Sequence, residues 1–152
     1  MILPPHHALA YLFLVGQAKT VMTRSDAVRF AADWVEAWNR LDIEAVLANF
    51  EDSVAFTSPT ALATVGVDTV HGKQELRAYW SAALARISSL RFDLQRTLWD
   101  PKTRELAIIY VSKVNGEAKW VSENLRFSQD GTVEAAEVFH GVGAALPSVR
   151  RR

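Results

Sequence analysis

A carboxyl group stands among apolar positions in the segment VSENLRF, residues 121–127. The segment alternates as a strand does, so Val121, Leu125 and Phe127 share one face, and Glu123 shares it with them. A carboxylate in apolar surroundings loses its hydration and either takes up a proton or finds a donor. The neutral acid can donate a hydrogen bond to a developing oxyanion, and the carboxylate beside an imidazole forms a general acid/base pair. Glu123 is therefore the first candidate catalytic residue.

The turns on both sides of this strand predict its neighbours. A two-residue Asn-Gly turn at 115–116 places Ile108 opposite Glu123. A regular turn around Asp-Gly at 130–131 makes His140 a diagonal neighbour of Glu123 on the same face, with backbones about 7 Å apart. A β-bulge in either strand would break this register. His140 is the second candidate catalytic residue.

Both candidates also have a structural interpretation. If the face is less enclosed, Glu123 reaches solvent or pairs with Lys119, and His140 makes one ordinary hydrogen bond at the rim of the sheet. His71, just before Gly72, is better explained as ordering the turn into a helix. The four histidines show no paired spacing such as HxxxH, and the chain has no cysteine, so we expect no metal site and no cofactor.

The first half of the chain has the patterns of helices. Apolar residues at helical spacing predict a helix that Ser25 or Asp26 caps and that runs to about Leu41. Asp42 then caps a second, shorter helix, and the segment SVAFTSP forms a strand that Pro59 ends. The stripe of the first helix comprises Val28, Ala31, Val35 and Trp38.

The second half is predicted to be mostly sheet. Residues 60–70 are expected to be a loop, and KQELRAYWSAALARI after Gly72 has the spacing of a third amphipathic helix. Four strands joined by turns follow, at about 90–98, 104–114, 117–128 and 132–141. Helices followed by strands predict an α+β fold with the helices on one face of a curved antiparallel sheet.

Composition limits the classes of partner. The chain has 152 residues, 49% of them hydrophobic, which suits one domain with a substantial core. Seventeen basic residues balance seventeen acidic ones, so we expect no nucleic-acid partner and no membrane surface. Charge therefore favours a neutral or mixed ligand.

The termini are interpreted separately from the domain. The apolar run ALAYLFLV is far shorter than the roughly 20 residues that span a bilayer, and no Lys or Arg precedes it. Residues 1–21 are therefore expected to be an appendage or a mispredicted start, with a cleaved signal as the alternative. Residues 22–145 form the domain and 146–152 a basic tail, and we expect a cytoplasmic protein.

Three segments together resemble a known group of proteins. The segments are, in chain order, WNRLDIEAVLANFEDSVAFTSP, VHGKQELRAYW and ENLRFSQDGTVEAAEVFHG. They resemble the nuclear transport factor 2-like superfamily, especially ketosteroid isomerases and SnoaL-like polyketide cyclases. The resemblance covers residues 25–141. It implies a cone of strongly curved antiparallel sheet that three helices close around a hydrophobic pocket, and usually a dimer.

The resemblance also assigns residues. The general-base Asp of ketosteroid isomerases falls on Ser58, so this base is missing, and their oxyanion-hole Tyr falls on Trp34. Their second oxyanion donor, a protonated Asp, falls on Glu123, as does the acid/base Asp of SnoaL-like cyclases. His140 stands where the group has a pocket-lining aromatic residue. The residues expected to line a cavity and bind ligand are Trp34, Phe56, Ser58, Tyr79 and Tyr110.

The opposite face of the sheet is expected to make contacts between proteins. By parity, Trp99 and Trp120 point to that face, where Ile109, Val111 and Trp120 form an apolar patch that would suit a homodimer interface. Three functions remain open from the sequence. The first is a cofactor-independent, isomerase- or cyclase-like lyase that uses acid/base chemistry of the isomerase, cyclase, dehydratase or hydrolase type on a hydrophobic carbonyl compound. The second is a noncatalytic protein that binds a hydrophobic small molecule, and the third is a dimeric interaction module.

Overall fold

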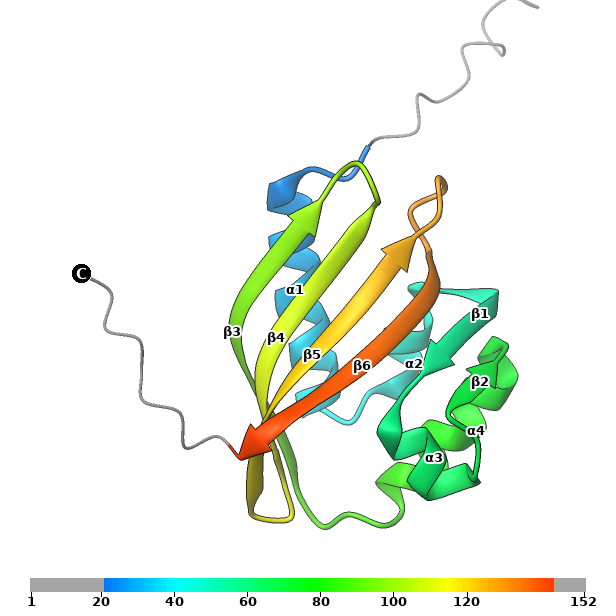
Figure 1. Ribbon diagram of the computed structural model, residues 1–152, viewed down its shortest axis with the longest axis vertical. Coiled ribbons are helices and arrows are strands. Elements are labelled where there is room, and N and C mark those ends of the chain that lie inside the picture. Colours follow the sequence, from blue (N-terminus) through cyan, green and yellow to red (C-terminus); the bar gives the residue numbers. More distant parts are fainter. Residues whose placement is uncertain (1–20, 144–152) are drawn as a thin grey trace, which may run out of the picture.

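The computed structural model describes residues 21–143 (Figure 1). The expected basic tail and all but the last residue of the expected appendage lie outside the described residues. The elements are α1 (Arg24–Asn39), α2 (Ile43–Leu47), β1 (Phe50–Thr57), α3 (Pro59–Val65), β2 (Thr69–His71), α4 (Lys73–Leu84), β3 (Leu90–Asp100), β4 (Glu105–Val114), β5 (Glu117–Phe127) and β6 (Val133–Gly143).

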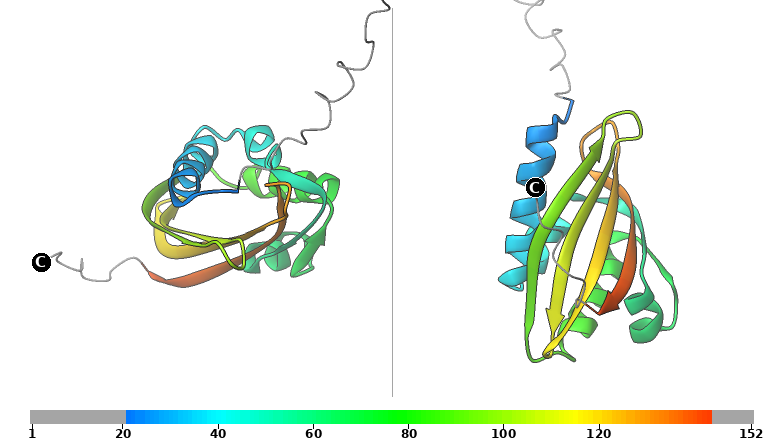
Figure 2. Two further views of the ribbon diagram at one scale, coloured as in Figure 1. Left: turned by 90° about the horizontal axis from the view of Figure 1, so that it is seen from above. Right: turned by 60° about the vertical axis from the view of Figure 1, so that its left-hand side comes forward.

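The strands form one six-stranded sheet in the order β2-β1-β6-β5-β4-β3. Strands β3 to β6 are a meander of antiparallel hairpins, as predicted. The pairing of β1 with β6 is parallel, which the hairpin pattern did not include. Figure 2 shows the sheet curving around an interior, with α1 lying across its open side. The predicted α+β fold with a curved sheet is confirmed, and the sheet is not closed into a barrel.

Helix α1 begins earlier than expected. Thr23, and neither Ser25 nor Asp26, is its N-cap, because Thr23 and Asp26 form a reciprocal capping box. The Thr23 hydroxyl accepts from the Asp26 N–H at 3.1 Å, and the Thr23 N–H donates to the Asp26 carboxylate at 2.9 Å. Val28 is 48% exposed, so its place in the buried stripe was wrong. The buried positions are Ala27, Ala31, Trp34, Val35, Ala37 and Trp38.

The segment predicted to be a loop, residues 60–70, contains a helix and a strand. Ser58 caps α3, Pro59 is its first residue, and Gly66 ends it at φ 81°. This is the usual asymmetry of Pro at the start and Gly at the end of a helix, and the prediction missed it. Strand β2 then pairs antiparallel with the end of β1. The structure therefore has four helices among residues 21–143, one more than predicted.

The registers around β5 are those that the turns predicted. Ile108 pairs with Glu123 across the Asn115–Gly116 turn, whose two residues have φ values of 51° and 82°. On the other side, Val138 pairs with Glu123, and His140 pairs with Val121. Positive φ at both central residues matches the twist of the flanking strands. The two hairpins thus place Glu123 of β5 between Ile108 of β4 and Val138 of β6.

Trp99 lies on the other face from the one predicted. The register of β3 shifts between Leu94 and Arg96, so the strand contains one extra residue at Gln95. An extra residue reverses the alternation that follows it. Trp99 is consequently on the core side, with its ring 6.0 Å from that of Phe127. Trp120 pairs with Val111 on the convex face, as the parity predicted.

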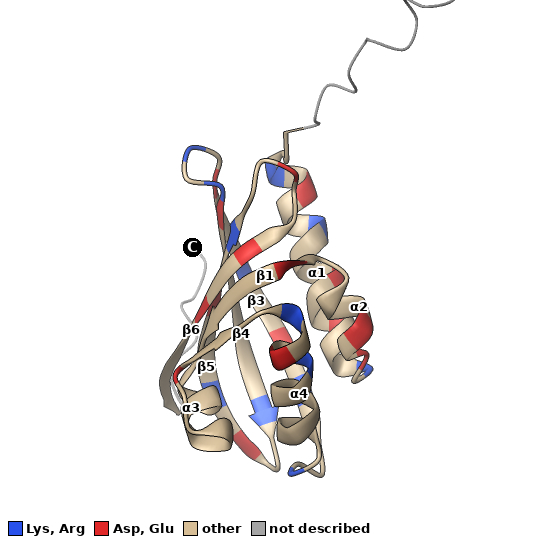
Figure 3. Cartoon of the chain, turned by 90° about the vertical axis from the view of Figure 1, so that its right-hand side faces the viewer, with Lys and Arg blue, Asp and Glu red and all other residues tan. Residues whose placement is uncertain are grey.

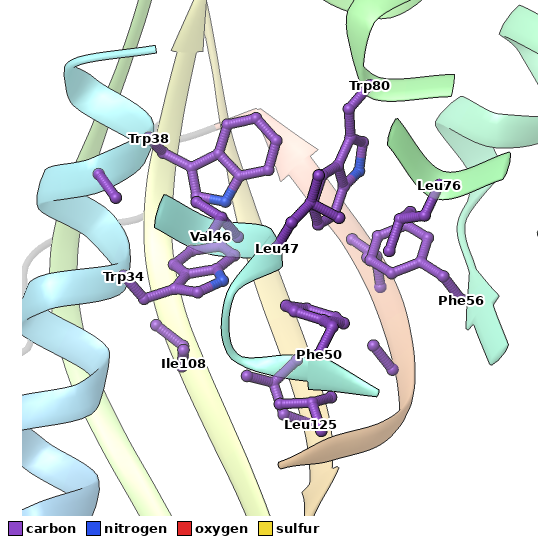
Figure 4. Close-up of a cluster of buried hydrophobic side chains, with 14 of the residues drawn as sticks. Trp34, Trp38, Val46, Leu47, Phe50, Phe56, Leu76, Trp80, Ile108 and Leu125 are labelled. Atoms are coloured by element: carbon purple, nitrogen blue, oxygen red, sulfur yellow. The ribbon is translucent and has the colours of Figure 1, made fainter. Parts of the chain in front are cut away.

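Aromatic side chains fill much of the space between the helices and the sheet. Trp34 and Trp38 project from α1 toward Trp80 of α4 (Figure 4). Trp38 meets Trp80 edge to face at 4.9 Å between ring centroids, and Trp34 stacks on Phe92 at 6.0 Å. Such pairs contribute about 0.5–1.5 kcal/mol each beyond the area they bury. They fix the position of α1 against the concave face.

Charged residues of both signs are interspersed on the helices. Figure 3 shows basic and acidic positions near one another on α1 and α4. Arg77 of α4 binds Glu44 of α2 through two hydrogen bonds, at 2.7 and 3.1 Å. The bidentate geometry ties the two helices together where they flank the sheet.

The end of α1 is joined to the edge of the sheet by one side chain. The Asn39 amide donates to the Phe92 carbonyl at 3.0 Å, and its carbonyl accepts from the Phe92 N–H at 2.7 Å. The amide therefore pairs with β3 as a neighbouring strand would.

Replacing Asn39 with Ala is expected to lower the free energy of unfolding by about 2 kcal/mol, because both Phe92 groups lose their partner. Urea denaturation measures this change. Asp33→Ala, on the exposed side of the same helix, is the control and should change stability by less than about 0.5 kcal/mol. Equal stability of the two variants would contradict the docking role.

Candidate functional site

A cavity of about 920 Å³ lies between the concave face of the sheet and the helices α1, α3 and α4. Its wall is mostly aromatic and aliphatic, with a few polar groups. All seven sequence-predicted site residues line it, namely Trp34, Phe56, Ser58, Tyr79, Tyr110, Glu123 and His140. They come from α1, β1, the start of α3, α4, β4, β5 and β6, so the tertiary fold brings them together.

Glu123 is the buried acid of the cavity. It is 4% exposed, between Ile108 of β4 and Val138 of β6. Burial raises the pKa of its carboxyl from an ordinary 4.5 to about 8, and a hydrogen bond from Tyr110 partly opposes this shift. The Tyr110 hydroxyl donates to Oε2 over a long 3.5 Å. At neutral pH the carboxyl is therefore mostly protonated, with a carboxylate fraction that grows toward pH 8.

Two tyrosines add hydroxyl groups to the same wall. Burial raises the pKa of Tyr110 well above its ordinary value, and the nearby Glu123 raises it further. Burial also raises the pKa of Tyr79, although hydrogen bonds with Ser58 and Thr60 lower it in part. Both phenols thus keep their protons at any physiological pH. They can donate hydrogen bonds, and they cannot serve as bases there.

His140 lies on the predicted face and has a different partner from the one expected. Its Nδ1 is 3.1 Å from the Lys119 ammonium, and among residues 21–143 it makes no hydrogen bond with Glu123. Burial and the charge of Lys119 lower the pKa of the imidazole. An ammonium has only donors, so Nδ1 accepts and the single proton of the neutral ring is on Nε2. His140 therefore offers a donor N–H.

Ser58 and Trp34 differ in what they can offer. The Ser58 hydroxyl accepts from the Thr60 N–H at 3.1 Å, which caps α3. Trp34 is 3% exposed, and its indole Nε1 is buried without a hydrogen-bond partner in the described part of the chain. Trp34 also lies 5.6 Å from Tyr110, measured between ring centroids. A donor without a partner among residues 21–143 thus lies close to the tyrosine that binds Glu123.

Among the polar residues of the wall that the sequence analysis missed are Ser112, Thr60 and Lys119. Ser112 is 5% exposed and shares its strand face with Tyr110, so parity along β4 could have identified it. Thr60 was missed because its helix was read as a loop. Lys119 was weighed only as a partner for Glu123, and its position two residues before Val121 places it on the cavity side.

The described residues provide neither a metal centre nor a membrane-spanning helix. Residues 21–143 contain no group of three or more His, Asp or Glu side chains that could hold a metal ion. None of the helices in this range is both long enough and apolar enough to cross a bilayer.

Comparisons with known proteins agree with this architecture. The family described as SnoaL-like domain matches residues 31–140. Because this match covers most of the chain, the protein belongs to the SnoaL-like domain family. Among curated proteins, none matches.

Solved structures show the same fold. A SnoaL-like protein of unknown function from Burkholderia thailandensis is 28% identical, with a TM-score of 0.71 over 79% of this chain and 98% of that one. An NTF2-like protein of unknown function from Burkholderia pseudomallei is 21% identical, with a TM-score of 0.64 over 76% and 90%. A steroid delta-isomerase from Pseudomonas aeruginosa is 18% identical, with a TM-score of 0.60 over 81% and 85%.

The raised pKa of Glu123 predicts how stability depends on pH. Between about pH 4.5 and 8 the folded protein holds a proton that the unfolded chain has released, so the free energy of unfolding falls as the pH rises. Glu123→Gln should abolish this slope and raise the free energy of unfolding at pH 7 by on the order of 3 kcal/mol.

Urea denaturation at pH 5, 6, 7 and 8 measures the effect. Glu117→Gln is the matched control, since Glu117 is exposed on the same strand and should keep the slope of the wild type. A Glu123→Gln protein with an unchanged slope would show that the carboxyl is not desolvated.

Proposed function

We propose that the protein is an enzyme that transfers a proton on a hydrophobic carbonyl compound, with Glu123 as the acid/base group. One observation carries the proposal: a carboxyl whose pKa is about 8 is enclosed in a cavity of ligand size and touches a tyrosine hydroxyl. A general acid/base is most effective when its pKa lies near the working pH. A purely structural position would be filled more stably by an uncharged residue.

Proton transfer in this site follows from the two forms of the acid. The Glu123 carboxylate takes a proton from the carbon beside the substrate carbonyl, and the electron pair of that C–H bond moves onto the carbonyl oxygen as an enolate. The protonated carboxyl then returns the proton to the same or another carbon, which restores the carboxylate and the carbonyl. Atoms and charge balance without an additional reactant, so the reaction is an isomerisation, or the first step of a cyclisation.

The donors of the wall are suited to the enolate oxygen. Among residues 21–143, no group accepts from the indole N–H of Trp34, and His140 has an N–H on Nε2. The Tyr110 hydroxyl donates to the Glu123 carboxylate and becomes available to the enolate once Glu123 has taken up the proton. Hydrogen bonds that strengthen as negative charge develops lower the barrier, and removing one such donor from an oxyanion hole typically costs about 2.7–4 kcal/mol. His140 acts here as a donor, since its Nδ1 already accepts from Lys119. Ser58 helps to position Tyr79 at the wall.

The proposal is tested by proton exchange on a model ketone. 2-Tetralone, a bicyclic hydrophobic ketone, is incubated with the protein in deuterium oxide, and NMR follows the loss of the protons beside its carbonyl. After subtraction of the rate in buffer, the wild type should catalyse exchange, and its rate should rise with the carboxylate fraction through about pH 8.

Glu123→Gln should reduce this rate by at least about 100-fold, because the amide cannot accept the proton. Glu117→Gln, at the exposed rim of the same cavity, should keep it. Binding of the ketone with no exchange in the wild type would contradict catalysis and would favour a ligand-binding protein.

We also propose a homodimer formed through the convex face of the sheet. Ile109 and Val111 lie on that face with Trp120, and the exposed Leu98 and Phe139 extend the patch. Their exposed fractions are 57% for Leu98 and 55% for Phe139. Large apolar side chains gathered on one surface are typical of protein interfaces.

Replacing Trp120 with Lys should therefore yield monomers, because a charge in an apolar interface loses its hydration. Sedimentation velocity at micromolar concentration measures the assembly state. Lys102→Met, in the exposed turn between β3 and β4, serves as a control and should stay dimeric. A monomeric wild type would refute this interface.

A further inference from the structure

Two ionisable side chains mark the two ends of the cavity along a single strand. Lys119 and Glu123 are four residues apart on β5 and share its concave face, with Val121 between them. A strand advances about 3.3 Å per residue, so their backbones are about 13 Å apart. Glu123 is buried, whereas Lys119 is half-buried beside the turn at Asn115, near the mouth.

The charge of Lys119 has no counterion in the described part of the chain. Its ammonium contacts the Nδ1 atom of His140 at 3.1 Å. A neutral imidazole satisfies one hydrogen bond and leaves the positive charge in place. Among residues 21–143, Lys119 lies within 4.0 Å of no carboxylate, whereas Lys73 and Lys113 each pair with an aspartate. The cavity thus contains a half-buried cation that no acidic group of the described residues neutralises.

The other charged groups at the mouth leave it positive. Arg86, after the end of α4, lines the same end and forms no ion pair with a described acidic residue. Glu117 also lines this end and is exposed. Two cations and one carboxylate leave one positive charge at the entrance, while Glu123 is mostly neutral at pH 7. An anionic group would be attracted to this end and not to the buried end.

We infer that the ligand is a rigid hydrophobic acid, with an uncharged acceptor oxygen at Glu123 and an anionic group, such as a carboxylate, at Lys119. The Lys119 ammonium contacts His140, which pairs with Val121, so the two polar ends are closer together than the two backbones. With a hydrogen bond at each end, the remaining span suits a ligand of one or two fused six-membered rings. The aromatic wall of Trp34, Phe56 and Tyr110 surrounds the rings. This inference rests on the proposed function only for the placement of the acceptor oxygen.

Three probes of matched shape test the inference. They are 6-hydroxy-2-naphthoate, its methyl ester and 2-naphthol, with dissociation constants measured by isothermal titration calorimetry at pH 6.5. The wild type should bind the carboxylate at least about tenfold more tightly than the ester. High salt should weaken binding of the carboxylate more than that of 2-naphthol.

Lys119→Met keeps the length of the side chain and removes its charge. It should remove the preference for the carboxylate over the ester and leave 2-naphthol binding within about twofold of the wild type, which also shows that the cavity is intact. Lys119→Arg should retain most of the preference. Lys102→Met makes the same change in net charge far along the sheet, in the turn between β3 and β4, and should have no effect.

Several outcomes would overturn the inference. These are equal binding of carboxylate and ester by the wild type, equal weakening of all three probes by Lys119→Met, and a loss of preference in Lys102→Met. Its failure can be told apart from failure of the proposed function. If 2-naphthol binds and 2-tetralone exchanges without any preference for the anion, only the inference about Lys119 is wrong. If the carboxylate is preferred and no exchange occurs, the proposed catalysis is wrong.

Discussion

The burial of the Glu123 carboxyl group requires that the strands on both sides of β5 keep their register. Glu123 sits between Ile108 and Val138, and both neighbouring strands must hold their register to keep it there. A shift of one residue in either hairpin would turn a different set of side chains toward the cavity. Burial opposes ionisation, and the hydroxyl of Tyr110 partly offsets it. The result is a group that can hold or release a proton near neutral pH, at some expense in stability.

The cavity exists because the sheet curves and the helices span it without filling it. Trp38 on α1 meets Trp80 on α4, Trp34 packs against Trp38, and these rings bridge the open side of the sheet (Figure 4). Asn39 holds the end of α1 to the edge strand through both backbone groups of Phe92. Large rings in edge-to-face contact are rigid and leave space that smaller, flexible side chains would fill. The packing of these rings between the helices therefore leaves the cavity in front of Glu123 unfilled.

Polarity is graded along the cavity, and this grading connects the fold with the proposed chemistry. The buried end offers a carboxyl and a phenol, the middle offers the imidazole of His140, and the mouth offers the ammonium of Lys119. Because alternate residues of one strand face the cavity, β5 alone supplies both ends of this series. The contact between Lys119 and His140 also fixes which ring nitrogen of His140 carries the proton. Lys119 at the mouth therefore determines that His140 donates a hydrogen bond from Nε2.

Local sequence determined a large part of this protein. Alternation and the Asn-Gly turn at 115–116 were enough to place Glu123 on an apolar face opposite Ile108, since period and turn length fix the register of a hairpin. Helical spacing likewise identified α1, α2 and α4. The short helix α3 could have been identified from Ser58, Pro59 and Gly66, because its start and end signals are local.

Other features depended on contacts between distant segments. The bulge at Gln95, which turns Trp99 inward, leaves no clear mark in the alternation. The parallel pairing of β1 with β6 joins segments about 80 residues apart, and no local pattern encodes it. Diagonal placement suggested that His140 would pair with Glu123, yet its hydrogen bond goes to Lys119. The reason is physical: register determines which side chains share a face, while burial and the choice among competing partners are decided only when all the strands and helices are packed together.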